Sequence, residues 1–349
     1  MICFPFRLTT GKEALHSEAV MMNYFLRRLL QSAIVLLAVA MLAFLMFRYI
    51  GDPVAQMVGQ ETTLAERAAL RQQLGLNDPV PVQFARFVLQ VLQGNFGISY
   101  QMGQPVGSLL AERLPATLEL SVMAFLFAAV AGIPMGIYTA LYPTGWLSRV
   151  FLVVSLAGIS LPTFFIGIML ILLFGVELAW LPTFGRGETV HLGWWTTGLL
   201  TLSGWKSILM PAFTLALFQL TFIMRLVRSE MIDVLRADFI KFARARGLSE
   251  RSINFGHALK NTLVPVMTVA GMQLGSIIAF GIITESVFQW PGIGLLFLQS
   301  ISTADIPVMS TYLLMVALIF IVINLTVDLL YYAVDPRLRV DNAGGRASS

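Results

Sequence analysis

The sequence predicts an all-α integral membrane protein with six transmembrane helices and both termini in the cytoplasm. Of its 349 residues, 57% are apolar and 12% are charged, whereas a soluble domain has about 45–50% apolar and about 25% charged residues. The mean hydropathy of +0.79 agrees with a chain whose solvent is lipid. This composition excludes a disordered chain, a fibrous repeat and an ordinary soluble enzyme. The single cysteine, Cys3, excludes an intrachain disulfide and a cysteine-rich metal site.

The spans are predicted from the gaps between charged residues, because about 20 apolar residues cross a bilayer as a helix. Six uncharged stretches of 18 to 29 residues predict transmembrane helices near residues 29–48, 116–141, 150–175, 208–227, 263–285 and 310–333. The patterns Gly132-x-x-x-Gly136 and Gly271-x-x-x-Gly275 favour close contact between helices. Pro162 predicts a kink in the third span.

A seventh uncharged stretch, Thr189–Trp205, is predicted to be a loop on the membrane surface. It is short and contains three tryptophans, which favour the membrane interface. With six spans and the N-terminus inside, 16 of the 23 Lys and Arg residues lie in cytoplasmic segments, and eight of them lie from Arg225 to Lys260. A seventh span would move those eight outside, against the positive-inside rule.

This topology sets the expected boundaries within the chain. Residues 1–22 form an N-terminal cytoplasmic extension, 23–115 the first span and a periplasmic segment, 116–334 the main transmembrane domain, and 335–349 a cytoplasmic tail. The first span runs into Arg48 without a small-residue cleavage site, so we interpret it as a retained anchor. Translation starts at Met1, Met21 or Met22, and the sequence leaves this choice open.

The periplasmic segment is predicted to contain two helices. Thr63 and Glu66 have the spacing of a capping box, and Pro81 suits the start of a second helix. That second helix has one apolar face, formed by Phe84, Phe87, Val88, Val91 and Leu92, and Gly94 follows it. Packing of this face against the rest of the protein is the preferred interpretation, and docking of a partner protein is the alternative.

Catalytic and metal-binding patterns are missing from the sequence. The three histidines, His16, His191 and His257, are far apart and lack metal-ligand spacing. No phosphate-binding loop is found, and neither Gly97-Ile-Ser99 nor Gly158-Ile-Ser160 completes a serine-nucleophile motif. The sequence therefore predicts no catalytic residue, no metal and no cofactor.

The segment from Arg225 to Pro265 is the most informative part of the chain. It joins the fourth and fifth spans and is too apolar for a flexible linker. A short helix ending at Gly247 is expected, in which apolar side chains alternate with basic ones. On these residues alone, the helix could lie on anionic lipid headgroups or dock a cytoplasmic partner, and both interpretations stay open.

The same segment resembles a known family. Asp238–Arg251 and His257–Pro265 are similar to the cytoplasmic signature loop of ATP-binding-cassette (ABC) importer permeases, most closely the dipeptide/oligopeptide permeases. The resemblance extends over about residues 23–338. Its other stretches, in family order, are Asn23–Leu30, Gly51–Pro53, Gln73–Leu76, Gly94–Gly97, Thr284–Gly294, Asn324–Tyr331 and Asp335–Pro336.

The resemblance implies a type I ABC importer permease fold and a multi-pass location in the bacterial inner membrane. The chain would form half of a pathway for di- or oligopeptides, together with a second, homologous permease subunit. Cytoplasmic ATP-binding subunits would hydrolyse ATP, and a periplasmic substrate-binding protein would deliver the substrate. Membrane lipid surrounds the chain, and no nucleic acid is expected. The cytoplasmic coupling loop would span residues 228–262.

The resemblance also implies which residues meet the ATPase subunit. They lie in and directly after the short helix: Asp238, Phe239, Lys241, Ala243, Arg244, Ala245, Arg246 and Gly247. The Ala and the Gly of the family's loop correspond to Ala243 and Gly247. The first two positions of the general Glu-Ala-Ala signature are Lys241 and Phe242 here, so no salt bridge from that glutamate position is assumed.

A second group of residues is expected to shape or gate the pathway: Glu285, Trp290, Pro291, Gly292, Asp328 and Arg225. Charges near membrane depth are costly and often functional. For Glu285, which like Glu119 lies near the end of a span, support of the Phe288–Gly294 turn is the preferred interpretation. Substrate binding is the alternative.

Two other functions compete with this prediction. An ion-coupled secondary transporter would carry coupling charges at mid-membrane, whereas the span centres here are uncharged. An intramembrane enzyme would need a nucleophile or metal ligands. The substrate itself stays open among dipeptides, oligopeptides, glutathione, nickel chelates and sugars, because selectivity in such systems resides largely in the binding protein.

Overall fold

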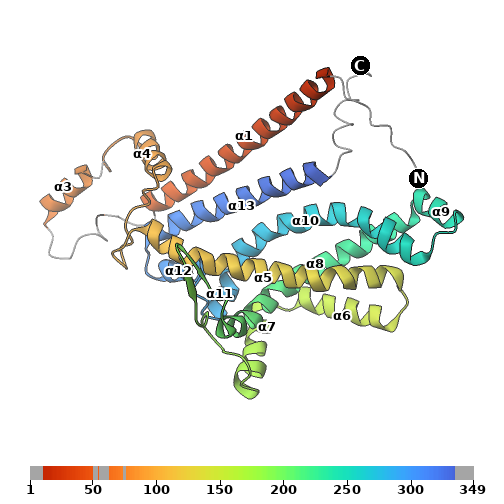
Figure 1. The fold of residues 1–349 in the computed structure, drawn as a ribbon. Coiled ribbons are helices and arrows are strands. Elements are labelled where there is room, and N and C mark those ends of the chain that lie inside the picture. The colour runs from red at the N-terminus through yellow and green to blue at the C-terminus, as the bar shows by residue number, and fades with distance from the viewer. Residues whose placement is uncertain (1–10, 50–53, 55–62, 74–75, 335–349) are drawn as a thin grey trace.

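The computed structural model describes residues 11–49, 54, 63–73 and 76–334, which form a bundle of long helices (Figure 1). The five longest are α1 (Gly11–Tyr49), α5 (Val106–Leu141), α8 (Leu202–Arg236), α10 (Leu259–Phe280) and α13 (Ile306–Val334). The shorter helical elements are α3 (Leu64–Gln73), α4 (Val80–Leu92), α6 (Trp146–Ser160), α7 (Thr163–Leu170), η1 (Ile171–Glu177), α9 (Asp238–Ala245), η2 (Ser252–Ala258), α11 (Ile282–Val287) and α12 (Ile293–Ser302). Strands β1 (Val190–Leu192) and β2 (Trp195–Thr197) form an antiparallel hairpin.

The membrane spans agree with the prediction, although the helices are longer than the predicted spans. Five described helices are long and apolar enough to cross a bilayer, within Leu26–Tyr49, Val106–Leu141, Leu202–Arg236, Ser252–Phe280 and Ile306–Leu329. The bent pair formed by α6 and α7–η1 is a sixth if it is counted as one span. An uncharged gap marks only the apolar part of a helix, whereas the backbone hydrogen bonds continue into the polar ends.

The third span differs from the prediction of one kinked helix over residues 150–175. The chain instead forms two helices, Trp146–Ser160 and Thr163–Glu177, bent by 107° relative to one another. Pro162 is the N-terminal cap residue of α7, with a φ of −58° and a ψ of 135°, which is not a helical conformation. Because proline lacks an N–H and restricts the preceding residue, the helix ends before Pro162 and restarts after it.

The long helices run between two ends of the bundle. α9 lies at the right in Figure 1, beside the ends of α5 and α8, and we call this the α9 end. The hairpin, α11 and α12 lie at the left, which we call the hairpin end. The segment Thr189–Trp205 is therefore not a span, as predicted, because it contains the hairpin and the first turn of α8.

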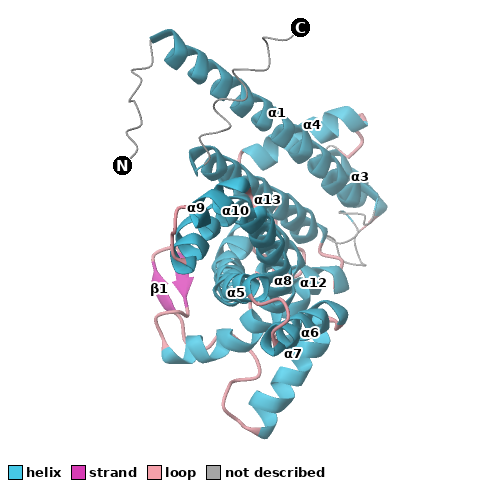
Figure 2. Cartoon of the chain, turned by 90° about the vertical axis from the view of Figure 1, so that its right-hand side faces the viewer, coloured by secondary structure: helices cyan, strands magenta, loops and turns pink. Residues whose placement is uncertain are grey.

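The centre of the bundle is the contact between α5 and α8, which lie side by side when viewed from the α9 end (Figure 2). A Cβ added at Gly136 would lie 2.6 Å from Val227 Cβ and 2.7 Å from the Met224 carbonyl oxygen. A Cβ added at Gly132 would lie 3.0 Å from the Leu220 carbonyl oxygen. The predicted close contact at this glycine pair is thus confirmed, since only glycine lets the two backbones approach so closely.

The second glycine pair joins α10 to α13. A Cβ at Gly271 would lie 2.6 Å from Val327 Cγ2, and one at Gly275 would lie 2.6 Å from Phe320 Cδ2. This contact is also the one that the G-x-x-x-G spacing predicts.

The segment before α5 packs on α1, as the preferred interpretation of its apolar face stated. The predicted capping box is present at the start of α3, where Thr63 N donates to Glu66 Oε2 at 2.9 Å and Glu66 N donates to Thr63 Oγ1 at 3.3 Å. The hydrogen bonds that the Thr63 N–H and then the Thr63 hydroxyl donate to the Glu66 carboxylate lower the pKa of this carboxyl below its usual value. In α4, Phe84 and Phe87 lie 5.5 and 5.9 Å from the ring of Phe44 on α1. The helix ends before Gly94, which has a φ of +74°.

The connection between α4 and α5 is held by the buried carboxylate of Asp305, which directly precedes α13. Ser99 Oγ donates to Asp305 Oδ2, and the backbone N–H groups of Tyr100 and Gln101 donate to the same carboxylate at 3.3 and 3.4 Å. Burial and the charge of Asp305 raise the pKa of Tyr100 to about 12. The hairpin end is thereby tied together by residues that are 206 positions apart in the sequence.

We predict that Gly136→Val lowers the thermal unfolding temperature of the purified protein in detergent. The added side chain overlaps Val227 and Met224, and over-packing of a tight interface typically costs about 1–3 kcal/mol. Gly256→Ala is the matched control, because a Cβ there meets nothing closer than Ser252 Oγ at 3.8 Å. Equal unfolding temperatures for Gly136→Val and the wild type would contradict the close α5–α8 contact.

Candidate functional site

The helix α9 is fixed to the end of the bundle by two side chains on one face. Ile240 and Ala243 are three residues apart, so they point to the same side of the helix, and both are buried. They pack in a cluster whose other buried members are Ala140, Met231, Ile253 and Ala258. This cluster joins α9 to the ends of α5 and α8 and to η2, so any displacement of α9 is carried into those helices.

The rest of the α9 surface is open and combines aromatic with basic side chains. Phe239 and Phe242 are 46% and 64% exposed. Lys241 Nζ donates to Asp238 Oδ1 at 2.8 Å, and the Arg246 guanidinium lies 5.8 Å from the ring centre of Phe242. A surface of this kind is suited to a protein partner, because aromatic and arginine side chains dominate binding energy at interfaces.

The residues predicted to dock the ATPase subunit divide between these two faces. Ala243 packs on the chain's own cluster, so a direct contact from its side chain to a partner is not available in this arrangement. The remaining seven are exposed: Asp238, Phe239, Lys241, Arg244, Ala245, Arg246 and Gly247. Arg244 also pairs with Glu250 at 3.0 Å, which holds the segment after α9 against the helix.

The turn after α9 depends on Gly247. The helix is capped at Arg246, and Gly247 has a φ of +77°, a conformation that L-residues rarely adopt. No atom lies within 4 Å of a Cβ built at this position. The requirement for glycine is therefore one of backbone conformation rather than of space.

Four of the predicted gating residues meet at the hairpin end, around the turn formed by residues 285–295. Thr117 Oγ1 on α5 donates to Glu285 Oε1 at 2.6 Å, and the Leu295 N–H donates to Glu285 Oε2 at 2.8 Å. Trp290 is 1% exposed, and its Nε1 donates to the Ala116 carbonyl oxygen at 2.9 Å. The carboxylate thus holds the turn from inside and ties it to α5.

Gly292 and Pro291 complete this turn. A Cβ at Gly292 would collide with the Glu285 carboxylate and with Thr117 Oγ1, so the close approach of the backbone requires glycine. Pro291, between Trp290 and Gly292, is half-buried.

Asp328 and Arg225 lie apart from that turn. Asp328 on α13 pairs with Arg28 on α1, with Oδ2 3.3 Å from Nη1, and this pair is partly exposed. Arg225 is exposed on α8, toward the α9 end. The six gating candidates therefore form one cluster of four and two separate positions.

A buried ion pair that the sequence did not reveal ties the hairpin region to α5. Arg186 Nη2 lies 2.5 Å from Glu119 Oε2, and both side chains are more than nine-tenths buried. Arg186 also donates to Thr196 Oγ1 at 2.9 Å and to the Thr196 carbonyl oxygen at 2.6 Å. The partners are 67 residues apart. The only feature of the sequence that pointed to this ion pair was the charge of Glu119 near the end of a span.

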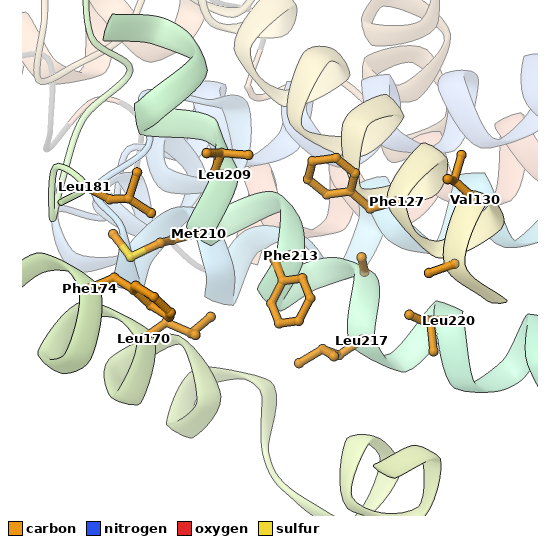
Figure 3. A pocket seen from close by; sticks show the side chains of 12 residues that line it. Phe127, Val130, Leu170, Phe174, Leu181, Leu209, Met210, Phe213, Leu217 and Leu220 are labelled. Carbon is orange, nitrogen blue, oxygen red and sulfur yellow. The ribbon is translucent and has the colours of Figure 1, made fainter. Parts of the chain in front are cut away.

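An apolar cavity of about 460 Å³ lies between α5, α7–η1 and α8 (Figure 3). Its lining consists of Phe127, Val130, Ala131, Leu170, Phe174, Leu181, Leu209, Met210, Phe213, Ala216, Leu217 and Leu220. No lining side chain can pair with a charged group, so a peptide bound here would leave its ammonium and carboxylate termini unpaired. The lining residues of this chain therefore offer no countercharge to such a substrate.

Metal-binding chemistry finds no support in the part of the chain that the structure describes. No group of three or more His, Cys, Asp or Glu side chains there could hold a metal ion.

Comparison with known proteins gives two family matches that together cover most of the chain. Residues 132–340 match the family described as "Binding-protein-dependent transport system inner membrane component", and residues 21–121 match the N-terminal part of such components. The glutathione transport system permease protein GsiC of Salmonella paratyphi A is 38% identical over 91% of this chain and 99% of its own length. The dipeptide transport system permease protein DppB of Alkalihalophilus pseudofirmus is 36% identical over 91% of this chain and its whole length.

A solved structure shares the fold. An inward-facing form of the MetNI methionine ABC transporter contains a chain that superposes with a TM-score of 0.52 at 19% identity. The match covers 65% of this chain and 96% of that chain.

We predict that Glu119→Gln destabilises the protein strongly, because it leaves the Arg186 guanidinium buried without a countercharge. Removal of one partner of a buried pair typically costs about 3–5 kcal/mol. The matched control is Arg86→Gln, which breaks the exposed Arg86–Asp78 pair at 2.7 Å; exposed pairs contribute about 0–1 kcal/mol. Thermal unfolding in detergent measures both, and equal losses in the two variants would contradict a buried pair.

Proposed function

The chain belongs to the family of binding-protein-dependent transport system inner membrane components, and on that premise we propose that it forms half of the peptide pathway of an ABC importer. It is a permease component located in the bacterial inner membrane. The proposal goes further in naming a second permease as the other half, cytoplasmic ATP-hydrolysing subunits as the energy source, and a periplasmic binding protein as the source of substrate.

The proposal of a separate ATPase subunit rests on the two sides of α9. α9 is anchored on its buried face by Ile240 and Ala243, while its open face presents Phe239 and Phe242 among basic side chains. An anchored helix with an open aromatic and basic face can receive a force from a partner and pass it to α5 and α8. A lipid-surface helix would instead insert its aromatic face into the headgroup region, with nothing to couple to.

The orientation follows from the charges. The eight basic residues from Arg225 to Lys260 lie in the last part of α8, in α9, in the segment between α9 and η2, and at the start of α10, and therefore at the α9 end. The positive-inside rule supports assigning this end to the cytoplasm. The hairpin end, with the turn at residues 285–295 and the segment between α1 and α5, then faces the periplasm and the binding protein.

Di- or oligopeptides are the proposed substrates. The relatives that cover nine-tenths of the chain are named as glutathione and dipeptide permeases, and glutathione is itself a small peptide. In the mechanism we propose, ATP binding and hydrolysis move α9 and its attached helices as a body against the second permease. The pathway between them then opens alternately to the periplasm and to the cytoplasm.

The experiment that tests this function is uptake into proteoliposomes that contain the assembled importer. With binding protein outside and ATP inside, we predict that a radiolabelled dipeptide or glutathione accumulates, and that accumulation stops without ATP. Uptake driven by an ion gradient alone, with no ATPase subunit bound, would contradict the proposal and favour a secondary transporter.

We predict that Gly247→Val uncouples ATP hydrolysis from uptake in the same preparation. A β-branched residue at a φ of +77° strains the turn that sets the position of the α9 surface. Gly247→Asn is the matched control, because asparagine tolerates this conformation and the space around position 247 is open. The ratio of peptide imported to ATP hydrolysed is the measurement, and a wild-type ratio for Gly247→Val would count against a docking role for this turn.

A further inference from the structure

Several threonine hydroxyls in the long helices are hydrogen-bonded within their own helix. The hydroxyl groups of Thr214, Thr221, Thr268, Thr311 and Thr326 each donate to the carbonyl oxygen four residues earlier in the same helix. These hydroxyls are satisfied within their own helix and require no outside partner.

The carboxamide of Gln219 on α8 is not satisfied. The residue is 5% exposed, and its Oε1 is fully buried without a hydrogen-bond partner among the described residues. No hydrogen bond from its Nε2 is found in that part of the chain either. A buried amide without a partner destabilises the state that contains it, so this group calls for a partner that the isolated chain does not supply.

Gln219 lies inside the membrane rather than at its edge. It is 13 residues from Lys206 and six from Arg225, the charges that bound its uncharged stretch. At a rise of 1.5 Å per residue, these separations are about 20 and about 9 Å along the helix. A polar side chain at this depth is costly and is expected to have a function.

Gln219 lies on the buried side of α8, next to the side of the helix that carries an open stripe. Phe218, Phe222, Arg225 and Ser229 follow helical spacing; Phe222 is half-buried and the other three are exposed. Gln219 is about 60° around the helix from Phe222. The exposed side of α1, in contrast, is aliphatic, with Leu29, Leu30 and Ile34. The stripe on α8 has aromatic rings inside the membrane and an arginine and a serine at the membrane edge, and such a polar end fits a protein-lined passage better than hydrocarbon.

We propose that transport uncovers the Gln219 side chain on the translocation pathway, and that its Oε1 then accepts a hydrogen bond from the peptide N–H of the passing substrate. This inference rests on the proposed function. A carboxamide is neutral and offers both an acceptor and donors, so it matches a peptide group without selecting side chains. Its neutrality also avoids holding a zwitterionic peptide too tightly to be released. The apolar cavity, which Leu217 and Leu220 line on another side of α8, contributes no such contact.

The test compares a peptide with its ester analogue in the assembled importer. Radiolabelled alanyl-alanine has a peptide N–H, and alanyl-lactate has an ester oxygen in its place. The same binding protein serves every variant. The preference of the binding protein for one of the two substrates therefore cancels when the amide-to-ester ratio of maximal rates is compared between variants. For Gln219→Leu we expect a maximal rate for alanyl-alanine lower by about fivefold, the effect of one neutral hydrogen bond. We also expect the amide-to-ester ratio to fall below that of the wild type. The half-saturating concentration should not change, because the binding protein sets it.

Two variants serve as controls. Thr214→Val removes a buried hydroxyl that is already bonded to the Met210 carbonyl oxygen at 2.8 Å, and it should keep both the rate and the ratio. Gln219→Asn retains a carboxamide and should recover part of the ratio. Thermal unfolding of Gln219→Leu should occur at or above the wild-type temperature, since the variant removes an unpaired amide.

The outcomes separate the two proposals. An unchanged amide-to-ester ratio in Gln219→Leu overturns the substrate contact while leaving the proposed function intact. Loss of the second permease from purified Gln219→Leu also overturns it, because the amide would then bond across the subunit interface. Failure of the wild type to import alanyl-alanine with ATP overturns the proposed function, and the inference with it.

Discussion

The close packing of α5 against α8 is the contact on which the rest of the molecule depends. Gly132 and Gly136 remove two side chains from the interface, so that the backbones of the two helices nearly touch. At one end of this pair, Ile240 and Ala243 seat α9 on both helices. At the other end, α5 holds the hairpin region through Glu119 and the turn at residues 285–295 through Thr117. Both functional ends are therefore attached to one rigid pair of helices.

Much of the fold could be predicted from the sequence, because the cost of placing a charge in lipid is a strong and local constraint. Gaps between charges located the spans, and glycine spacing located two helix contacts. The 107° bend at Pro162 could not be predicted, because a proline fixes where a helix is interrupted but not the angle at which it resumes. That angle depends on what the second helix packs against.

The candidate site was predicted less completely. The resemblance identified the residues of the α9 segment but not their sides, and only the structure separates buried Ala243 from exposed Phe242. The Glu119–Arg186 pair joins positions 67 residues apart, and the sequence around either residue does not indicate its partner. Gln219 could not be identified from the sequence, because what distinguishes it is a missing hydrogen bond rather than its residue type.

In the proposed mechanism, α9 and the hairpin end move as one body during transport. Spin labels at Ala245→Cys on α9 and Glu188→Cys before the hairpin, with Cys3 replaced by serine, would report the distance along this body in the assembled importer. Both labelled positions are exposed. Double electron–electron resonance should give the same distance between positions 188 and 245 without nucleotide and with a non-hydrolysable ATP analogue. The distance from Ala245→Cys to its counterpart in the second permease should change between the same two conditions. A nucleotide-dependent change between positions 188 and 245 would contradict the account.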